Sequence, residues 1–555
     1  MKRIVCFALA IIMISGLCVS FAQEGSDITK YEAENGILHG HLKSYTDFSG
    51  YSGTGYVGKF SSDDSYLEIP ITVSETGRYD IIVRNNSEGY YKSNYLYIDN
   101  ETVGMIESEE ISGWQDCKFE AVKITKGTHT LTIKKSWGWI YVDYITLEKG
   151  EGISDSVYDA SFPLSNPNAN DDAKRLWKYL CDNYGKNIIS GQYTDNGQYS
   201  SEYRAILEAT GEAPAIWGFD MMDYSPSRIS YGTKPKSVDY AIKWAKDYGG
   251  IVTFCWHWTP NKKYLNVNDR PWWSGFYTEA TSINLADVMN GKDEEGYNYI
   301  IEDIDAIAVQ LKRLQDEGIA VLWRPLHEAS GGWFWWGTDR DSYLKLWNLL
   351  YDRLTNYHQL NNLIWVWNGQ KADWYPGDDT VDIIGEDIYA DQKDTSSQMA
   401  KFIKAKNYTN PPKMICLSEN GVIPDIDNCI EDHVMWSWFG VWGGEFTVSN
   451  DKLSSKYTPT DIYKKVYQSD RVITLSEVPD LSNYPLNNEE TETNVKGDIN
   501  YDGSLNIVDV VLARAYIIGS KPLSDYQISV GDMNEDGVID IIDVVIMRAT
   551  IVGTR

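Results

Sequence analysis

Cysteine is scarce in this chain, with seven among 555 residues. Two of the seven, Cys6 and Cys18, lie in an N-terminal segment that we expect to be removed. The others form an odd and widely spaced set: Cys117, Cys181, Cys255, Cys416 and Cys429. Secreted domains that depend on disulfides carry dense, even sets, so a disulfide framework is excluded. Cys255 and Cys416 lie within apolar runs and are expected to be small buried residues rather than nucleophiles.

Long apolar runs are absent beyond Ala22. No later stretch reaches about 18 uninterrupted apolar residues, so no segment is expected to span a membrane. The start of the chain has Lys2-Arg3, then an apolar run, then Ser20-Phe21-Ala22, which is typical of a secretory signal. Residues 1–22 are therefore predicted to be a signal peptide, and the mature protein to be secreted and extracellular. Cys18 follows Gly16-Leu17, a poor match to a lipoprotein signal, so lipid anchoring is the less favoured alternative.

Basic residues are few: 50 Lys and Arg against 80 Asp and Glu give a formal net charge of −30. This excess of negative charge repels phosphate backbones and argues against nucleic acid as a partner. It suits a soluble extracellular protein with calcium sites and an uncharged substrate. Aromatic residues, by contrast, are abundant, with 21 Trp and 39 Tyr. Such side chains pack cores, and their flat faces also stack on the apolar faces of sugar rings.

Hydrophobic patterning divides the mature chain into three modules and a linker. Residues 27–149 contain short alternating strands separated by Gly, Asn and Ser, which predicts a β-sandwich. Residues 161–478 alternate apolar strands with helical stretches, which predicts an α/β fold. Residues 483–496 form an acidic linker rich in Thr and Asn. Residues 497–555 contain a repeat.

Eight strand candidates in the α/β region predict a (β/α)8 TIM barrel. They are residues 187–192, 213–219, 251–258, 320–326, 363–368, 381–388, 414–419 and 434–442. In such a barrel the carboxyl ends of the strands converge on the catalytic face. Polar residues at these ends are therefore candidates for chemistry.

The C-terminal repeat consists of residues 497–519 and 531–553, which are identical at 13 of 23 positions. Each copy has oxygen-bearing residues, and a glycine at position 6, at the spacing of a loop that wraps a hard cation such as Ca²⁺. The expected calcium ligands are Asp498, Asn500, Asp502, Ser504, Asn506 and Asp509 in the first loop and Asp532, Asn534, Asp536, Val538, Asp540 and Asp543 in the second. An apolar stretch after each loop predicts one helix, and no helix is expected before either loop.

This pair of loop–helix units resembles the dockerin module of cellulosomal enzymes. The resemblance implies that the partner is a cohesin domain of a scaffoldin, and that the protein is a monomer within a cell-surface cellulosome. Loop positions 10 and 11 contribute to partner choice in this family and are often Ser-Thr, but here they are Ile507-Val508 and Ile541-Ile542. These apolar pairs leave the cohesin type open. The alternative is a calcium clip that only stabilises the C-terminus.

Two glutamates are candidates for glycoside hydrolysis. Glu328 lies in an aromatic-rich run after the fourth predicted strand, and Glu419 lies in Ser-Glu-Asn-Gly at the end of the seventh. These strands place both on opposite walls of one cleft, and a retaining glycosidase needs carboxyl groups about 5–5.5 Å apart. Strand position predicts Glu328 as the proton donor (acid/base) and Glu419 as the nucleophile, whose charge raises the pKa of Glu328. The alternative for each is a salt bridge at the barrel rim.

These motifs resemble glycoside hydrolase family 26 over residues 170–475. The resemblance implies the same roles for the two glutamates and adds five substrate-binding residues: His257, His327, Trp333, Tyr389 and Trp442. Gly443 stands where some mannanases of the family have arginine, so the details of this subsite stay open.

Two further interpretations concern neighbouring residues. A metal site at His257, His327 and Glu328 lacks a zinc-binding spacing such as HExxH, so no cofactor is expected for catalysis. The alternative for each histidine is a neutral ring that packs at a strand end. Four more tryptophans follow the third and fourth strands and are either sugar platforms or packing: Trp272, Trp273, Trp335 and Trp336.

The N-terminal module resembles carbohydrate-binding module family 35. It begins Tyr31-Glu32-Ala33-Glu34 and ends in a strand that contains Asp143. The resemblance implies that Glu32, Glu34 and Asp143 hold a structural calcium, and that Trp137 and Trp139 bind sugar. The alternative is that these tryptophans only pack the sandwich.

Together these features predict a secreted, retaining endo-β-1,4-mannanase that hydrolyses plant mannans, galactomannan and glucomannan among them, and docks on a cellulosome. Mannan is favoured because it is the commonest substrate of the family. The same mechanism on β-1,3-1,4-glucan or β-1,3-xylan is the alternative. A non-catalytic carbohydrate-binding scaffold protein, from a different class, requires a broken carboxylate pair, and both glutamates are present.

Overall fold

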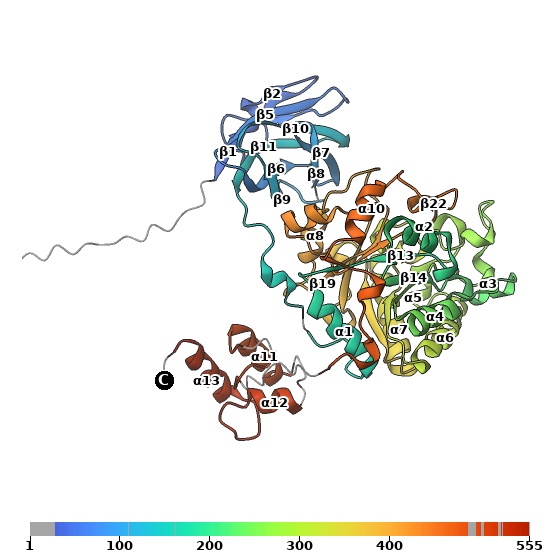
Figure 1. Ribbon diagram of the computed structural model, residues 1–555. Helices are drawn as coiled ribbons and strands as arrows, with labels where there is room; N and C mark the ends of the chain where they lie inside the picture. Colours follow the sequence, from blue (N-terminus) through green and yellow to red (C-terminus); the bar gives the residue numbers. More distant parts are fainter. Residues whose placement is uncertain are drawn as a thin grey trace, which may run out of the picture. The chain divides into compact units, whose positions relative to one another are not determined.

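The structure is a computed structural model that describes residues 28–108, 110–160, 162–486, 495–500, 504–519, 523 and 525–553 (Figure 1). The predicted signal peptide, residues 487–494 of the predicted linker, and Asp502 lie outside the described residues. The chain divides at residue 152 into two compact units, which are described separately. In the described part of the chain, no helix is both long enough and apolar enough to cross a bilayer.

The N-terminal unit consists of two sheets around one core. One sheet has the order β3-β4-β11-β6-β9, with β1 paired to β11, and the other has the order β2-β5-β10-β7-β8. Their bounds are β1 Thr29–Glu32, β2 Ile37–Leu38, β3 Lys43–Tyr45, β4 Tyr56–Gly58, β5 Tyr66–Val73, β6 Gly77–Asn86, β7 Lys92–Ile98, β8 Glu101–Ser108, β9 Trp114–Ile124, β10 Gly127–Trp137 and β11 Tyr141–Lys149. Alternate residues of β5 and β6 are buried because successive side chains point to opposite faces of a sheet. The predicted β-sandwich is confirmed.

The second unit contains a closed barrel of eight parallel strands in chain order, β13 to β20. Their bounds are β13 Gly191–Tyr193, β14 Ile216–Asp220, β15 Ile251–Cys255, β16 Val321–Arg324, β17 Leu363–Trp367, β18 Ile383–Ile388, β19 Met414–Asn420 and β20 Phe439–Val441. Every residue of β14 to β17 is buried, as expected for strands enclosed by helices. The predicted TIM barrel is confirmed.

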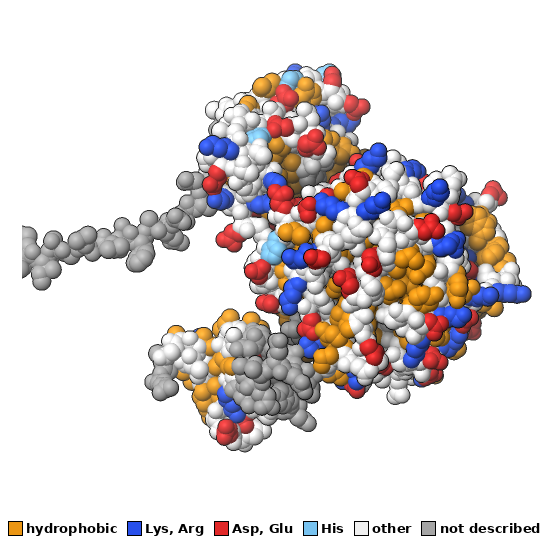
Figure 2. Space-filling model, viewed as in Figure 1, with side chains coloured by type: hydrophobic (Ala, Val, Ile, Leu, Met, Phe, Trp, Pro, Cys, Tyr) orange, Lys and Arg blue, Asp and Glu red, His pale blue; other side chains and the backbone are white. Residues whose placement is uncertain are grey.

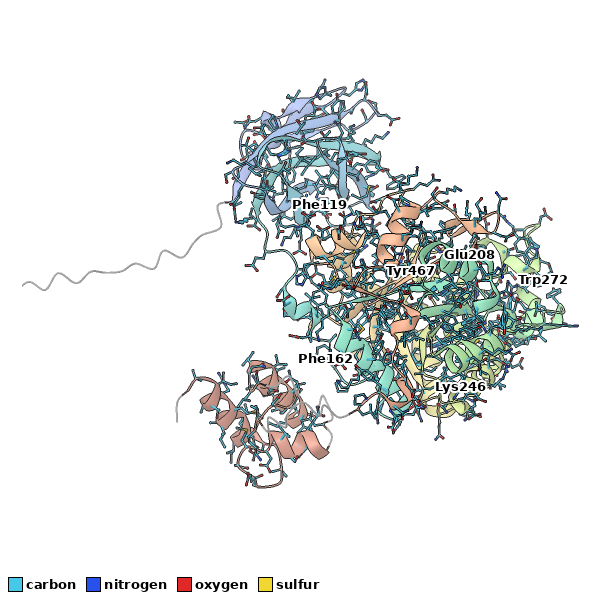
Figure 3. All side chains as sticks on the ribbon, viewed as in Figure 1. Phe119, Phe162, Glu208, Lys246, Trp272 and Tyr467 are labelled. Carbon is cyan, nitrogen blue, oxygen red and sulfur yellow. The ribbon has the colours of Figure 1, made fainter. Side chains whose placement is uncertain are left out.

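Helices surround the barrel (Figure 1). Those of the second unit before the repeat are α1 Asp171–Asn183, α2 Ser201–Thr210, α3 Pro226–Ser230, α4 Ser237–Tyr248, α5 Leu285–Met289, α6 Glu294–Asp316, α7 Arg340–Asp352, α8 Met399–Lys406, α9 Ile426–Asp432 and α10 Thr460–Tyr467. Their ends follow local chemistry: the Asp293 carboxylate accepts the Gly296 N–H at the start of α6, and Gly211 ends α2 in the left-handed conformation. Tyr467 of α10 is buried and Lys246 of α4 is exposed; both residues are labelled in Figure 3.

Aromatic packing accounts for much of the barrel core. Twelve tryptophans are its largest fully buried side chains: Trp217, Trp244, Trp256, Trp258, Trp323, Trp335, Trp336, Trp347, Trp365, Trp367, Trp436 and Trp438. On the visible face, acidic and basic side chains are interspersed (Figure 2). Most of the chain's tryptophans therefore stabilise the fold and are not available for stacking on sugars.

The C-terminal repeat forms α11 (Ile507–Ile517), α12 (Asp525–Gly531) and α13 (Ile541–Ile551). The helix expected after each loop is present, and each begins with a capping box made by loop positions 9 and 12: Asn506 with Asp509, and Asp540 with Asp543. The expectation of no helix before either loop was wrong for the second loop, because α12 ends at Gly531, directly before Asp532. Ile528 of α12 packs against the core of the repeat, which stabilises this short helix.

Candidate active site

The structure brings Glu328 and Glu419 together at the carboxyl ends of the barrel strands. Glu419 lies in β19, and Glu328 follows β16. One carboxylate oxygen each of Glu328, Glu419 and a third acid, Asp387 of β18, lie within 4.8 Å of one another. The structure therefore brings the two predicted glutamates close together, at the ends of the strands on which the sequence places them.

Two donors hold the buried carboxylate of Glu419. Arg324 Nη2 donates to Glu419 Oε2 at 2.6 Å, and the Tyr389 hydroxyl donates to Oε1. Tyr389 was expected here from the sequence. Arg324 was not, although a lone arginine at the end of an apolar strand was a visible signal.

Arg324 also joins Glu419 to Asp387. Arg324 Nη1 donates to Asp387 Oδ2 at 2.5 Å, and the Ser418 hydroxyl donates to Asp387 Oδ1 at 2.7 Å. All of these side chains are buried. Burial, opposed by Arg324 and reinforced by Glu419, raises the pKa of Asp387 well above its usual range. One guanidinium thus bonds two carboxyl groups in the buried part of the site.

Glu328 lies in a turn with unusual backbone geometry. Its φ is +53° and that of Leu326 is +51°, in the left-handed region that residues with side chains seldom adopt. The Glu328 N–H donates to Asn368 O at 2.7 Å, which ties the turn to the end of β17. Trp333 Nε1 donates to Glu328 Oε2 at 2.8 Å. Burial, then the charge of Glu419, raises the pKa of Glu328.

Two histidines lie beside the glutamates. His257 Nε2 and His327 Nε2 are 3.3 Å apart, and the His257 ring packs against Phe276, Phe334 and Trp442. His257 Nδ1 is 2.6 Å from Asp220 Oδ2. The structure therefore brings both predicted histidines to the site, together with Asp220, which sequence reasoning missed.

The aromatic candidates separate by exposure. Trp333 and Tyr389 are 46% and 45% exposed, and each bonds one of the two glutamates. Trp335 and Trp336 are fully buried, which favours packing. Trp272, at the edge of the barrel in Figure 3, stacks on Tyr231 with ring centroids 4.6 Å apart.

In the N-terminal unit, the loop at residues 52–54 forms hydrogen bonds with three acidic side chains. The Ser52 and Thr54 N–H groups donate to Asp143 Oδ1 and Glu34 Oε1, at 2.9 and 2.6 Å. The second oxygens of Glu32, Glu34 and Asp143 are buried without a hydrogen-bond partner in the described structure, although Arg84 Nε lies 3.8 Å from Asp143 Oδ2. Burial, then repulsion by Glu32, raises the pKa of Asp143. Three clustered acids with unsatisfied oxygens fit a hard cation such as Ca²⁺.

Trp137 and Trp139, predicted as sugar-binding residues, lie in different aromatic clusters. Trp137 is 62% exposed and packs near Tyr91, while Trp139 is 37% exposed and packs edge-on against Tyr141. Gly138, between them, has a φ of +77°. The structure thus leaves both rings accessible but does not combine them into one platform.

In both loops of the repeat, the aspartate at position 12 accepts the backbone N–H groups of loop positions 2 and 9. Asp509 accepts the N–H groups of Ile499 and Asn506, both at 2.8 Å. Asp543 accepts those of Met533 at 2.7 Å and Asp540 at 2.8 Å. In the second loop, Asp532 also accepts the N–H of Gly537 at 2.8 Å. The described ligand candidates of both loops include carboxylate and amide oxygens, the kind of ligand that Ca²⁺ binds.

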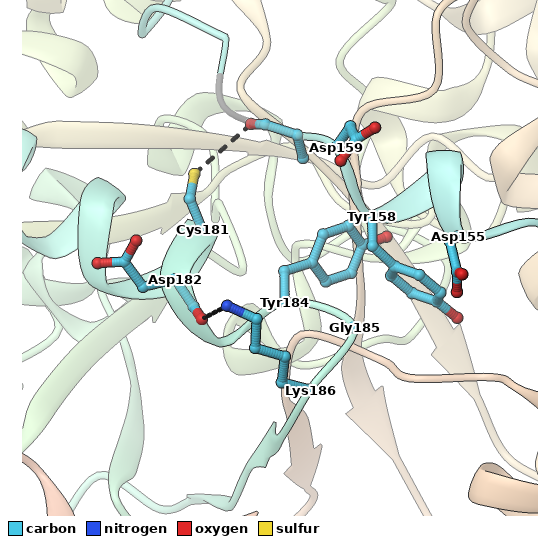
Figure 4. Close-up of a pocket in the computed structure, with 9 residues that line it drawn as sticks. Asp155, Tyr158, Asp159, Cys181, Asp182, Tyr184, Gly185 and Lys186 are labelled. Carbon is cyan, nitrogen blue, oxygen red and sulfur yellow. Dashed lines mark hydrogen bonds between the residues drawn. The ribbon is translucent and has the colours of Figure 1, made fainter. Parts of the chain in front are cut away.

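A separate hollow of about 360 Å³ has neither Glu328 nor Glu419 among its lining residues. Figure 4 shows it in close-up. It is lined by Asp155, Tyr158, Asp159, Ala160, Cys181, Asp182, Tyr184, Gly185 and Lys186. The Tyr184 hydroxyl accepts the N–H of Ile415, near the amino end of β19. In a TIM barrel, residues at the amino ends of the strands contribute to stability rather than to catalysis.

Comparisons with known proteins match three parts of the chain to family models. These are glycosyl hydrolase family 26 over residues 165–477, carbohydrate binding module (family 35) over residues 29–150, and the dockerin type I domain over residues 496–551.

Relatives and solved structures agree with these matches. A mannan endo-1,4-beta-mannosidase of Thermothelomyces thermophilus is 40% identical over 468 residues, covering 82% of this chain and 92% of the relative. Mannan endo-1,4-beta-mannosidase B of a Piromyces species is 35% identical, covering 81% and 77%. The crystal structure of a GH26-CBM35 beta-(1,4)-mannanase of Podospora anserina has a TM-score of 0.57 and 37% identity, covering 82% of this chain and 99% of that one. The chain therefore belongs to glycosyl hydrolase family 26 and also carries a family 35 carbohydrate-binding module and a dockerin type I domain.

Proposed function

We propose that the protein is a secreted, retaining endo-β-1,4-mannanase that acts on plant mannans as part of a cellulosome. The observation that carries this proposal is the meeting of Glu328 and Glu419 around Arg324 at the carboxyl ends of β16 and β19. Membership of glycosyl hydrolase family 26 and the names of the relatives support the choice of mannan. The proposed modules are residues 27–149, 161–478 and 497–555, joined by a linker at 483–496.

In the first chemical step, the Glu419 carboxylate attacks the anomeric carbon and the bond to the leaving sugar breaks. Glu328 gives its proton to the departing glycosidic oxygen at the same time. The raised pKa of Glu328 suits this role, because an acid must still hold its proton at working pH. In the second step Glu328 takes a proton from water, whose oxygen displaces Glu419, and the original configuration is restored. Activity is lost as pH rises through the pKa of Glu328.

The sugar next to the cleaved bond is proposed to lie among His257, His327, Trp333, Tyr389 and Trp442. The histidines offer hydrogen bonds to hydroxyl groups, and Trp442 and Trp333 offer flat apolar faces. Buried polar groups that read one hydroxyl can separate an axial from an equatorial position at C2, which distinguishes mannose from glucose.

Product release from five polysaccharides tests the substrate. Linear mannan, galactomannan, glucomannan, mixed-linkage β-1,3-1,4-glucan and β-1,3-xylan are compared at equal mass. We expect short oligosaccharides from the three mannans, with little release from the other two. Faster release from the glucan or the xylan would keep the mechanism and overturn the substrate. No release from any of them by the intact protein would favour a non-catalytic scaffold protein.

Ca²⁺ is proposed as a structural ion in two modules. Glu32, Glu34 and Asp143 would hold it in the N-terminal module. In the repeat the ligands would be Asp498, Asn500, Asp502, Ser504, Asn506 and Asp509, and Asp532, Asn534, Asp536, Val538, Asp540 and Asp543. When bound, the ion would offset repulsion among these acids and close each loop. None of these residues belongs to the group of barrel acids around Glu328 and Glu419, so loss of the ion is expected to leave the proposed catalytic carboxyl groups in place.

Chelation separates these roles in the intact protein. In EDTA we expect proteases to cleave residues 497–555 at least about tenfold faster, because the loops lose the ion that closes them. Hydrolysis of soluble mannan is expected to change by less than about twofold. Mass spectrometry of the fragments and a reducing-sugar assay give the two readouts, and Asp532→Ala should reproduce the effect without EDTA. Unchanged cleavage of the repeat would remove the calcium assignment.

A cohesin domain is the proposed partner of the repeat. The paired residues at loop positions 10 and 11 are exposed in both copies, from 41% at Val508 to 62% at Ile541. Exposed apolar residues in a row commonly mark an interface. Attachment through this surface would place the enzyme on an extracellular cellulosome.

A further inference from the structure

Three neighbouring strands of the barrel contribute one hydrogen-bonded chain of side chains. Asp220 is the last residue of β14, His257 follows β15, and His327 follows β16. Asp220 Oδ2 lies 2.6 Å from His257 Nδ1, and His257 Nε2 lies 3.3 Å from His327 Nε2. The rings of the two histidines meet edge to face, with centroids 4.6 Å apart. A proton on one of these groups therefore constrains the others.

The backbone fixes the orientation of Asp220. Its Oδ1 accepts the N–H groups of Met222 at 2.8 Å and His257 at 3.0 Å. Both of these are permanent donors, so Oδ1 must remain an acceptor, and Oδ2 is left to face the His257 ring. Burial opposes ionisation of Asp220, but the charge and hydrogen bonds of His257 outweigh it and lower the pKa of Asp220. Oδ2 is therefore an ionised carboxylate oxygen, and His257 carries a proton on Nδ1.

Only one hydrogen fits between the two Nε2 atoms. When His257 is neutral, its Nε2 is an acceptor and the proton lies on His327 Nε2. When His257 is charged, its Nε2–H donates, and neutral His327 must carry its own proton on Nδ1. His327 Nδ1 is buried and has no hydrogen-bond partner in the described structure. The charge of His257 therefore selects the tautomer of His327.

We propose that Asp220 is a positioning residue that fixes the tautomer of His257, and that His257 and His327 share one proton at the sugar-binding cleft. The groups whose charges act on His257 are Asp220, Glu419, Arg324, His327, Glu328 and Asp195. Burial opposes protonation, but Asp220 outweighs it and raises the pKa of His257. Burial and Arg324 lower the pKa of His327 well below its usual range, which keeps that ring neutral. The hydroxyl of a bound sugar would meet either a donor or an acceptor according to this one proton.

Asp220→Asn tests the proposal because the side chains of aspartate and asparagine have nearly the same shape. The substitution therefore changes the charge and the hydrogen-bonding pattern but not the packing. The two backbone N–H groups require the amide oxygen at the Oδ1 position, so the amide NH₂ must face His257 Nδ1. Neutral His257 then has to carry its proton on Nε2. His257 also loses the negative charge of Asp220, which favoured its protonated form.

Histidine ¹⁵N spectra of the full-length protein over a pH series give the readout, with His257→Gln to assign the signals. In the wild type we expect His257 Nδ1 to stay protonated throughout, and the His327 nitrogens to shift at the pH where His257 titrates. In Asp220→Asn we expect His257 Nδ1 to lose its proton and the titration to fall by about one to three pH units. Asp223→Asn, which removes a nearby acid paired with Arg228, should leave both signals unchanged.

Unchanged His257 signals in Asp220→Asn, or a His327 titration separate from that of His257, would overturn the proposal. The inference rests on the proposed function only in placing a sugar at these histidines, since the spectra require no hydrolysis. In activity assays, kcat/KM on mannan is expected to fall by about 10- to 100-fold in Asp220→Asn, the effect of one mispaired buried hydrogen bond. If mannan proved not to be the substrate, the spectra would still decide whether Asp220 fixes the tautomer of His257.

Discussion

Replacing Glu419 with alanine is expected to reduce mannan hydrolysis by at least about 10⁴-fold. The carboxylate is the only group proposed to attack the anomeric carbon, and its removal stops the first step. Reducing-sugar release at matched protein concentration gives the rate. Circular dichroism should show an intact fold, because the space left beside Arg324 and Tyr389 can fill with water.

Two further variants make the result specific. Glu445→Ala removes an exposed glutamate paired with Lys456 and should keep full activity. Azide distinguishes the two catalytic roles. With Glu419→Ala it should attack from the open face and give a glycosyl azide of inverted configuration. With Glu328→Ala it should intercept the covalent intermediate and give the retained configuration. Residual activity of Glu419→Ala above about 10% of wild type would contradict the nucleophile assignment.

Replacing Arg324 with methionine is expected to lower the free energy of unfolding of the barrel by about 3–5 kcal/mol. Arg324 is 1% exposed and bonds both Asp387 and Glu419, so an apolar side chain leaves two buried acids without their cation. Activity should fall as well, because Glu419 loses one of its two donors. Urea unfolding followed by tryptophan fluorescence reports on the barrel, where the largest buried tryptophans lie.

The matched control is Arg340→Met on α7. Arg340 is about half exposed and pairs with Asp341 and Asp373 at the surface. Such pairs contribute about 0–1 kcal/mol, so its loss should be small. Equal destabilisation by the two substitutions would mean that the buried network around Arg324 does not stabilise the barrel.

Periodicity in the sequence was sufficient to predict the barrel, but not the ends of its strands. All eight predicted strands correspond to β13 to β20, because continuous apolar runs between helices have few other interpretations. The first run, 187–192, is divided at Ser190: residues 188–189 pair with β23 (Val472–Ile473), and only Gly191–Tyr193 joins the barrel. The last run, 434–442, contributes only Phe439–Val441. The ends of the strands are set by hydrogen bonding to neighbouring strands. Because those neighbours are distant in the sequence, a local pattern does not predict the ends.

The candidate site was predicted in part for a similar reason. Glutamates at strand ends next to aromatic residues stand out in a sequence, whereas Asp220, Asn368 and Asp387 look like ordinary polar residues beside apolar runs. Their role in the site depends on their hydrogen-bond partners on other strands of the barrel. Those partners are set by the order and tilt of the strands. The sequence was sufficient to predict which strands end in polar residues, but not which residues those side chains bond.

The left-handed turn at Glu328 has a consequence for how this enzyme can evolve. A side chain held at a φ of +53° costs the native state of the order of 1 kcal/mol or more, and glycine would adopt the same turn at no steric cost. Selection for a more stable barrel therefore favours losing the very residue proposed to handle the proton. Only selection for hydrolysis keeps a glutamate there. A relative that has become a pure binding protein should drift to glycine or asparagine at this position before the rest of the cleft changes.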